Sequence, residues 1–112
     1  NSIFWEDYYA KEIVKVIDLS KAGDEIWIDV HKATEIAQKN KVTSSSDYFV
    51  IDNVKNEVCV QLNQERKNCY SFFNDVDVTR ELKLAYGTDE NGKNVNILYL
   101  KVNKASWFEE NL

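Results

Sequence analysis

The two cysteines of the chain lie on either side of a short polar break, and this arrangement constrains the fold more than any other feature. Residues 57–62 alternate apolar and other side chains before the break, and residues 69–73 alternate again after it. Alternation with a period of two on both sides of a polar break predicts two antiparallel strands joined by a turn. The break, residues 63–67, contains no glycine, so a loop of about three to five residues fits better than a two-residue turn.

The register of this hairpin predicts a disulfide. With Gln64 at the centre of the turn, Cys59 faces Cys69, and opposed residues without mutual hydrogen bonds have Cα atoms about 4.5–5.5 Å apart. That distance overlaps the lower part of the disulfide range of about 4.4–6.8 Å. The same register gathers one apolar face, which we take as the core face: Val58, Val60, Leu62, Tyr70 and Phe72. We therefore expect a Cys59–Cys69 bridge and an oxidising compartment, the alternative being two buried thiols in a cytosolic protein.

Other chemistry-bearing residues form no recognisable set. The cysteine spacing matches no zinc motif, and His31 is the only histidine. Asp75 and Asp77 are weak candidates for a calcium ligand pair, but the glycine and the final acid of an EF-hand loop are missing, and turn formation explains them better. No nucleophile with a supporting acid can be placed beside His31. We therefore expect no cofactor, no bound metal and no catalytic activity.

Composition is that of one folded domain with an acidic surface. The chain has 112 residues, of which 44% are hydrophobic and 29% charged, and its net charge is −5. An acidic chain without a basic face argues against a nucleic-acid partner. No run of 18 apolar residues occurs, so the sequence contains no membrane span. Because the chain starts at Asn1 and lacks methionine, we expect a processed or truncated product, and the segment before Asn1 could have been a signal or an anchor.

Residues 1–21 are predicted to form the first helix. Ser2 is the expected N-cap, and Glu6 and Asp7 lie in the early turns, where the helix dipole favours acids. Gly23 comes after the last residue of the helical apolar pattern and predicts the end of the helix. The apolar stripe consists of Tyr9 or Ala10, Ile13, Val14 and Ile17.

The beginning of this helix carries more apolar surface than one stripe needs. The crowded residues are Ile3, Phe4, Trp5, Tyr8 and Tyr9. Such a cluster either fills the end of a small core or forms an interface, and Trp and Tyr also suit a membrane boundary. We assign these five residues to an interface with a protein partner or another copy of the chain.

The remaining pattern predicts the fold class. Alternation indicates strands at residues 24–30, 47–52, 78–86 and 94–102 besides the two arms of the cysteine hairpin, and residues 31–40 suit a short helix. In residues 78–86 we expect Val78, Leu82 and Leu84 to point inward. Strands joined by short turns form an antiparallel sheet. The prediction is a single α+β domain over residues 1–112: a helix packed on a meander of about five strands, a short second helix and a tail at 103–112.

Two segments resemble a known family. The run YYAKEIVKVIDLSKAGDEI at residues 8–26 is similar to the region directly after the membrane segment in archaeal type IV pilin-like proteins. The pairing of EVCVQL with RKNCYSFFNDVDV resembles the continuation of such sequences. The resemblance implies a single-pass anchor upstream of Asn1 and an extracytoplasmic, non-catalytic role in a filament or an envelope assembly.

Two other functions stay open. The negative charge suits a soluble intracellular binding protein, such as an acidic inhibitor or immunity-type protein that masks a basic partner. A small hydrolytic enzyme would have to use Asp75, Asp77, Glu81 or His31, and the sequence shows no nucleophile–base pair or phosphate loop to support it.

Overall fold

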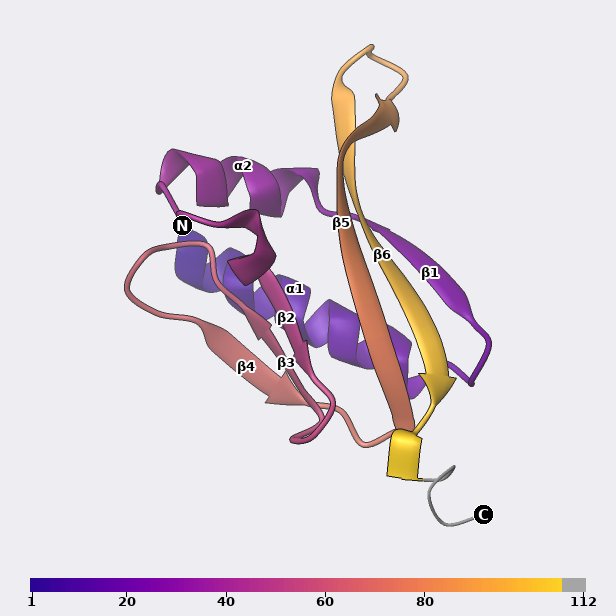
Figure 1. The fold of residues 1–112 in the computed structure, drawn as a ribbon. Helices are drawn as coiled ribbons and strands as arrows, with labels where there is room; N and C mark the ends of the chain where they lie inside the picture. The colour runs from indigo at the N-terminus through magenta and orange to yellow at the C-terminus, as the bar shows by residue number, and fades with distance from the viewer. Residues whose placement is uncertain (108–112) are drawn as a thin grey trace.

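The structure, a computed structural model, describes residues 1–107. The elements along the chain (Figure 1) are α1 (Ser2–Asp18), β1 (Glu25–Asp29), α2 (His31–Lys39), η1 (Ser45–Asp47), β2 (Phe49–Asp52), β3 (Glu57–Val60), β4 (Asn68–Ser71), β5 (Val76–Thr88) and β6 (Asn94–Lys104). The α+β class and the leading helix are confirmed. Of the predicted tail, residues 103 and 104 belong to β6, and residues 108–112 lie outside the described part.

The strands form two antiparallel sheets instead of the single meander that the sequence predicts. One sheet has the order β2-β3-β4 and the other β1-β6-β5, which makes six strands against the expected five or so. The first strand, β1, pairs with the last, β6, because α2 and the polar connector after it carry the chain away from β1 before β2 begins. Short turns predict pairing between neighbours in sequence, and this long-range pair has no local signal.

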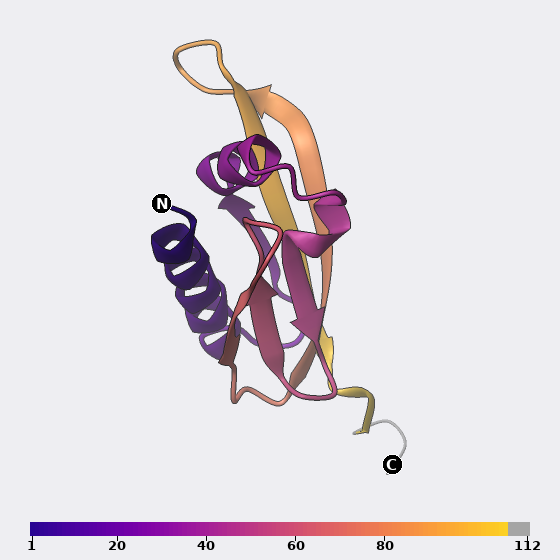
Figure 2. The same ribbon diagram turned by 90° about the vertical axis from the view of Figure 1, so that its left-hand side faces the viewer.

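The helix α1 supplies much of the core between the sheets. Figure 2 shows it along one side of β3 and β4, where Ala10, Ile13 and Ile17 are fully buried. These residues lie on the predicted stripe. From the other sheet, β6 contributes alternate residues that are also fully buried: Leu98, Leu100 and Val102. The predicted inner face of the cysteine hairpin is confirmed as well, with Val58, Val60, Leu62 and Phe72 buried and Tyr70 packed against them.

The ends of α1 differ from the prediction. The N-cap is Asn1, whose Oδ1 accepts a hydrogen bond from the Phe4 N–H at 3.2 Å, and not Ser2. The helix ends at Asp18, before the predicted boundary, and at this end Asn74 Nδ2 donates to the carbonyls of Ile17 and Ser20. Gly23 still serves the turn between α1 and β1, with a φ of 101° that glycine adopts without strain.

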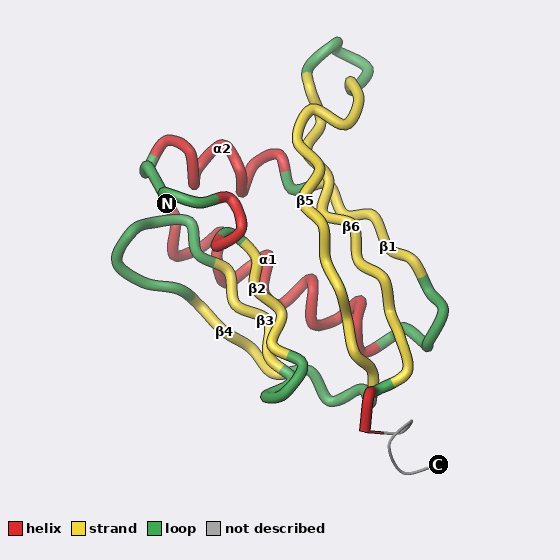
Figure 3. The backbone as a smooth tube through the Cα atoms, viewed as in Figure 1, coloured by secondary structure: helices red, strands yellow, loops and turns green. Residues whose placement is uncertain are grey.

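The β5–β6 hairpin projects beyond α2, as Figure 3 shows. Between Lys83 and Gly87 the register shifts, so Leu84, Ala85 and Tyr86 lie opposite Asn96 alone. The Asn96 side chain accepts from the Ala85 N–H at 2.9 Å and donates to Thr34 Oγ1 of α2 at 2.7 Å. Leu84 lies in this bulge, where the ladder is interrupted, and the prediction that it points inward is wrong: the residue is 49% exposed.

Candidate interaction surface

The aromatic cluster at the start of α1 is divided between surface and core. Ile3, Phe4 and Tyr8 are 54%, 58% and 44% exposed, whereas Tyr9 is only 7% exposed. Trp5 is partly buried against the core. Tyr9 is therefore removed from the five-residue interface of the sequence prediction, because it lies one helical turn before Ile13 on the stripe that faces the sheets. We call Ile3, Phe4 and Tyr8 the aromatic face.

Ring contacts connect the aromatic face to the core. Phe4 stacks on Tyr8 at a centroid distance of 6.4 Å, and both meet Trp5 edge-on at 5.1 and 5.6 Å. Tyr8 contacts Tyr9, whose ring lies 6.4 Å from that of Phe49 in β2. Burial raises the pKa of the Tyr9 hydroxyl. A continuous series of ring contacts therefore supports Phe4 and Tyr8 from the core outward, and side chains supported in this way have less conformational entropy to lose in a contact.

A cluster of three polar side chains joins the next turn of α1 to β4. The Tyr70 hydroxyl donates to the Asp7 carboxylate, and Lys11 Nζ lies 3.0 Å from that carboxylate and 5.3 Å from the centre of the Tyr70 ring. The hydrogen bond from Tyr70 and then the Lys11 ammonium lower the pKa of Asp7. The hydrogen bond to Asp7 raises the pKa of Tyr70 in turn.

The Asp7→Asn variant is expected to remove part of the pH dependence of stability. The folded pKa of Asp7 lies below its unfolded value of about 3.9. Its contribution is therefore complete above that unfolded value and disappears as the pH falls through the folded pKa. Urea unfolding should show wild type more stable than the variant at neutral pH and the difference shrinking in acid. Asp75→Asn, an exposed control, should show no such change, and a constant difference for Asp7→Asn would contradict the assignment.

A fully buried carboxylate joins α1 to the loop of the cysteine hairpin. It belongs to Glu6, which the sequence pattern places with Asp7 in the early turns of the helix. Glu6 Oε2 accepts from the Leu62 N–H at 2.8 Å and from Asn63 Nδ2 at 2.9 Å. Its Oε1 accepts from Asn68 Nδ2 at 3.2 Å and lies 3.5 Å from Arg66 Nε. We call this arrangement the Glu6 clasp. The only sequence signal for it is a run of amide and basic residues in a loop without glycine.

The clasp explains why the hairpin loop is longer than predicted. The ladder ends at Val60 and Asn68, which leaves residues 61–67 outside the strands. The Gln61 N–H donates to the Tyr48 carbonyl, and the Leu62 N–H donates to the Glu6 carboxylate. Neither residue therefore pairs with the strand β4. Gln64 donates to the carbonyls of Asn40 and Lys41 at the end of α2. The loop thus connects α1, α2 and the small sheet.

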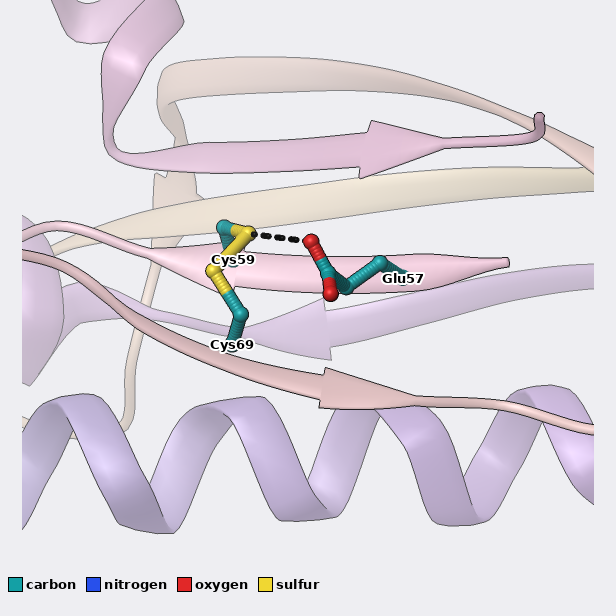
Figure 4. A group of neighbouring side chains, drawn as sticks. All are labelled: Glu57, Cys59 and Cys69. Carbon is teal, nitrogen blue, oxygen red and sulfur yellow. Dashed lines mark hydrogen bonds between the residues drawn. A yellow bond between two sulfur atoms is a disulfide. The ribbon is translucent and has the colours of Figure 1, made fainter. Parts of the chain in front are cut away.

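The predicted disulfide is present. Cys59 and Cys69 are direct partners in the β3–β4 register, with Cα atoms 4.1 Å apart, and their sulfurs are bonded. Glu57 lies two residues before Cys59 on the same face, and its Oε1 is 3.6 Å from Cys59 Sγ (Figure 4). A bridged sulfur carries no hydrogen, so this approach becomes a hydrogen bond only when the cysteines are reduced.

The other candidate residues predicted from the sequence are not brought together. Asp77 accepts from the Ser106 N–H, and Glu81 pairs with Lys83 at 2.9 Å. Asp77 and Glu81 are four positions apart on one strand, a distance of about 13 Å. His31 Nε2 lies 3.8 Å from the Glu35 carboxylate and its Nδ1 3.4 Å from the Asn96 amide. Within residues 1–107, the single group of three potential metal ligands is Glu57, Cys59 and Cys69, so Asp75 and Asp77 belong to none.

None of the helices within residues 1–107 combines the length and the apolar character that crossing a bilayer requires. No protein-family model matches the sequence, and neither a curated protein nor a solved structure matches it significantly.

Proposed function

We propose that this chain is a non-catalytic, extracytoplasmic interaction domain whose aromatic face binds a protein partner or another copy of the chain. The observation that carries the proposal is the exposure of Ile3, Phe4 and Tyr8 on a supported helix end. Exposed aromatic side chains on a rigid base are typical of the residues that dominate binding energy at interfaces.

The disulfide supports the compartment that we propose. Bridged cysteines form and persist outside the cytosol, and they are rare where thiol reductants are abundant. The resemblance to archaeal type IV pilin-like proteins suggests the setting: an ectodomain held at the cell surface by an anchor, in a filament or an envelope assembly. In that setting the start of α1 is the part nearest the anchor.

Site-specific photo-crosslinking tests this function. A photoreactive phenylalanine at position 4, in cells that make the protein, is expected to yield one discrete crosslinked species. Tyr8→Ser should reduce its yield about 30-fold, because losing an interface anchor costs about 2 kcal/mol.

The matched control is the same photoreactive group at Phe73, an exposed aromatic that follows β4 and lies beside the C-terminal end of α1. It should give no discrete species. Equal crosslinking from both positions, or none from position 4, would overturn the proposal. The size of the captured species distinguishes a second copy from a different protein.

A further inference from the structure

Three side chains with atoms that can bind a metal ion share the outer face of the β2-β3-β4 sheet. Glu57 and Cys59 are two residues apart on β3, and Cys69 is the cross-strand partner of Cys59. The neighbouring Val58 is buried on the opposite face, so the three side chains lie away from the main core. One ligand atom from each lies within 4.8 Å of the other two, as Figure 4 shows for the side chains.

Reduction converts this group into a set of metal ligands. A tertiary phosphine and water reduce the disulfide, giving the phosphine oxide and two thiols. Each thiol then loses its proton when a metal ion binds, because the thiolate is the ligand. Two thiolates and one carboxylate are donors that Zn²⁺ accepts, and hard cations such as Ca²⁺ and Mg²⁺ prefer sets made only of oxygen.

We propose that the reduced chain binds one Zn²⁺ through Cys59, Cys69 and Glu57, with water as the fourth ligand. Glu57 and Cys69 are partly exposed and Cys59 is 4% exposed, so the ion reaches the group from the side of Glu57 and Cys69. The strands do not depend on the bridge alone, because the Glu6 clasp and the β2 ladder hold the same hairpin. The ligands therefore stay in register after reduction.

Metal and disulfide exclude each other, because both use the same sulfur atoms. The oxidised chain has no thiolate at this position, and the metal-bound chain has no free thiol pair to oxidise. The spacing of the two cysteines in the sequence matches no zinc motif. The third ligand, Glu57, is recognised only from the strand register, which the spacing does not reveal. The zinc site is independent of the aromatic face and of its partner.

Titration with Co²⁺, a spectroscopic substitute for Zn²⁺, tests the site. The phosphine-reduced full chain is expected to bind one equivalent and to show the visible bands of a tetrahedral ion with a thiolate charge-transfer band. Added Zn²⁺ should displace the Co²⁺. The oxidised chain should show neither band.

Two variants identify the ligands. Cys69→Ser should abolish the charge-transfer band, and Glu57→Gln should weaken Co²⁺ binding at least about tenfold. Glu65→Gln, in the exposed part of the hairpin loop, is the matched control and should bind like wild type. Far-ultraviolet circular dichroism of each reduced protein establishes that the strands persist. Binding by the oxidised chain, unchanged affinity in Glu57→Gln, or no binding by folded, reduced wild type would each overturn the proposal.

Discussion

The Glu6→Ala variant is expected to lose about 3 kcal/mol of its free energy of unfolding. The substitution leaves the Leu62 N–H and the two asparagine amides without their acceptor, and each buried unsatisfied donor costs about 1–3 kcal/mol. Arg66 loses its ion pair but is partly exposed, so its guanidinium recovers hydration. Urea unfolding monitored by tryptophan fluorescence measures the loss.

A matched control separates this effect from that of removing any acid from α1. Glu12→Ala, at a partly exposed position of the same helix, should change stability by no more than about 0.5 kcal/mol. Glu6→Gln keeps the size of the side chain but presents an NH₂ group to donors, so its loss should lie between the other two. Equal losses in Glu6→Ala and Glu12→Ala would show that the clasp contributes little.

The Cys59→Ala/Cys69→Ala double variant is expected to lose about 2–3 kcal/mol relative to the oxidised protein. The bridge joins residues separated by 10 positions, and closing a loop of this size in the unfolded chain gives that amount in the loop-entropy account. Urea unfolding of the oxidised protein against the double variant measures it.

Reduced wild-type protein, measured in buffer that contains a metal chelator, is the control for the effect of the two introduced alanines. It should unfold at nearly the urea concentration of the double variant, because both lack the covalent constraint and the metal. If the double variant were as stable as the oxidised protein, the bridge would be mechanically redundant with the Glu6 clasp.

The sequence predicts features that depend on local period and register. Alternation on both arms of the hairpin, together with a turn centred at Gln64, opposes Cys59 and Cys69. The spacing along α1 identifies Ile13 and Ile17 as core residues. Alternation along residues 94–102 likewise places Leu98, Leu100 and Val102 on one apolar face, which is buried in β6. These features result from the geometry of one helix or one strand pair.

Features that depend on contacts between distant segments are not predictable in this way. The sequence identifies Glu6 only as an acid in the early turns of the first helix, and the position of the loop after β3 makes it a buried acceptor. Tyr9 differs, because its spacing from Ile13 already makes it a candidate for the buried stripe, and only its contact with Phe49 of β2 needs the whole fold. The β1–β6 pair and the bulge opposite Asn96 likewise need the whole fold.

The redox state of Cys59 and Cys69 in the producing cells tests the extracytoplasmic assignment most directly. Cells would be treated with a membrane-permeant alkylating reagent before lysis, and the intact mass of the recovered chain would count the blocked thiols. We predict an unmodified chain in which both cysteines become reactive only after reduction. Two blocked cysteines without prior reduction would contradict the extracytoplasmic account and favour an intracellular binding protein.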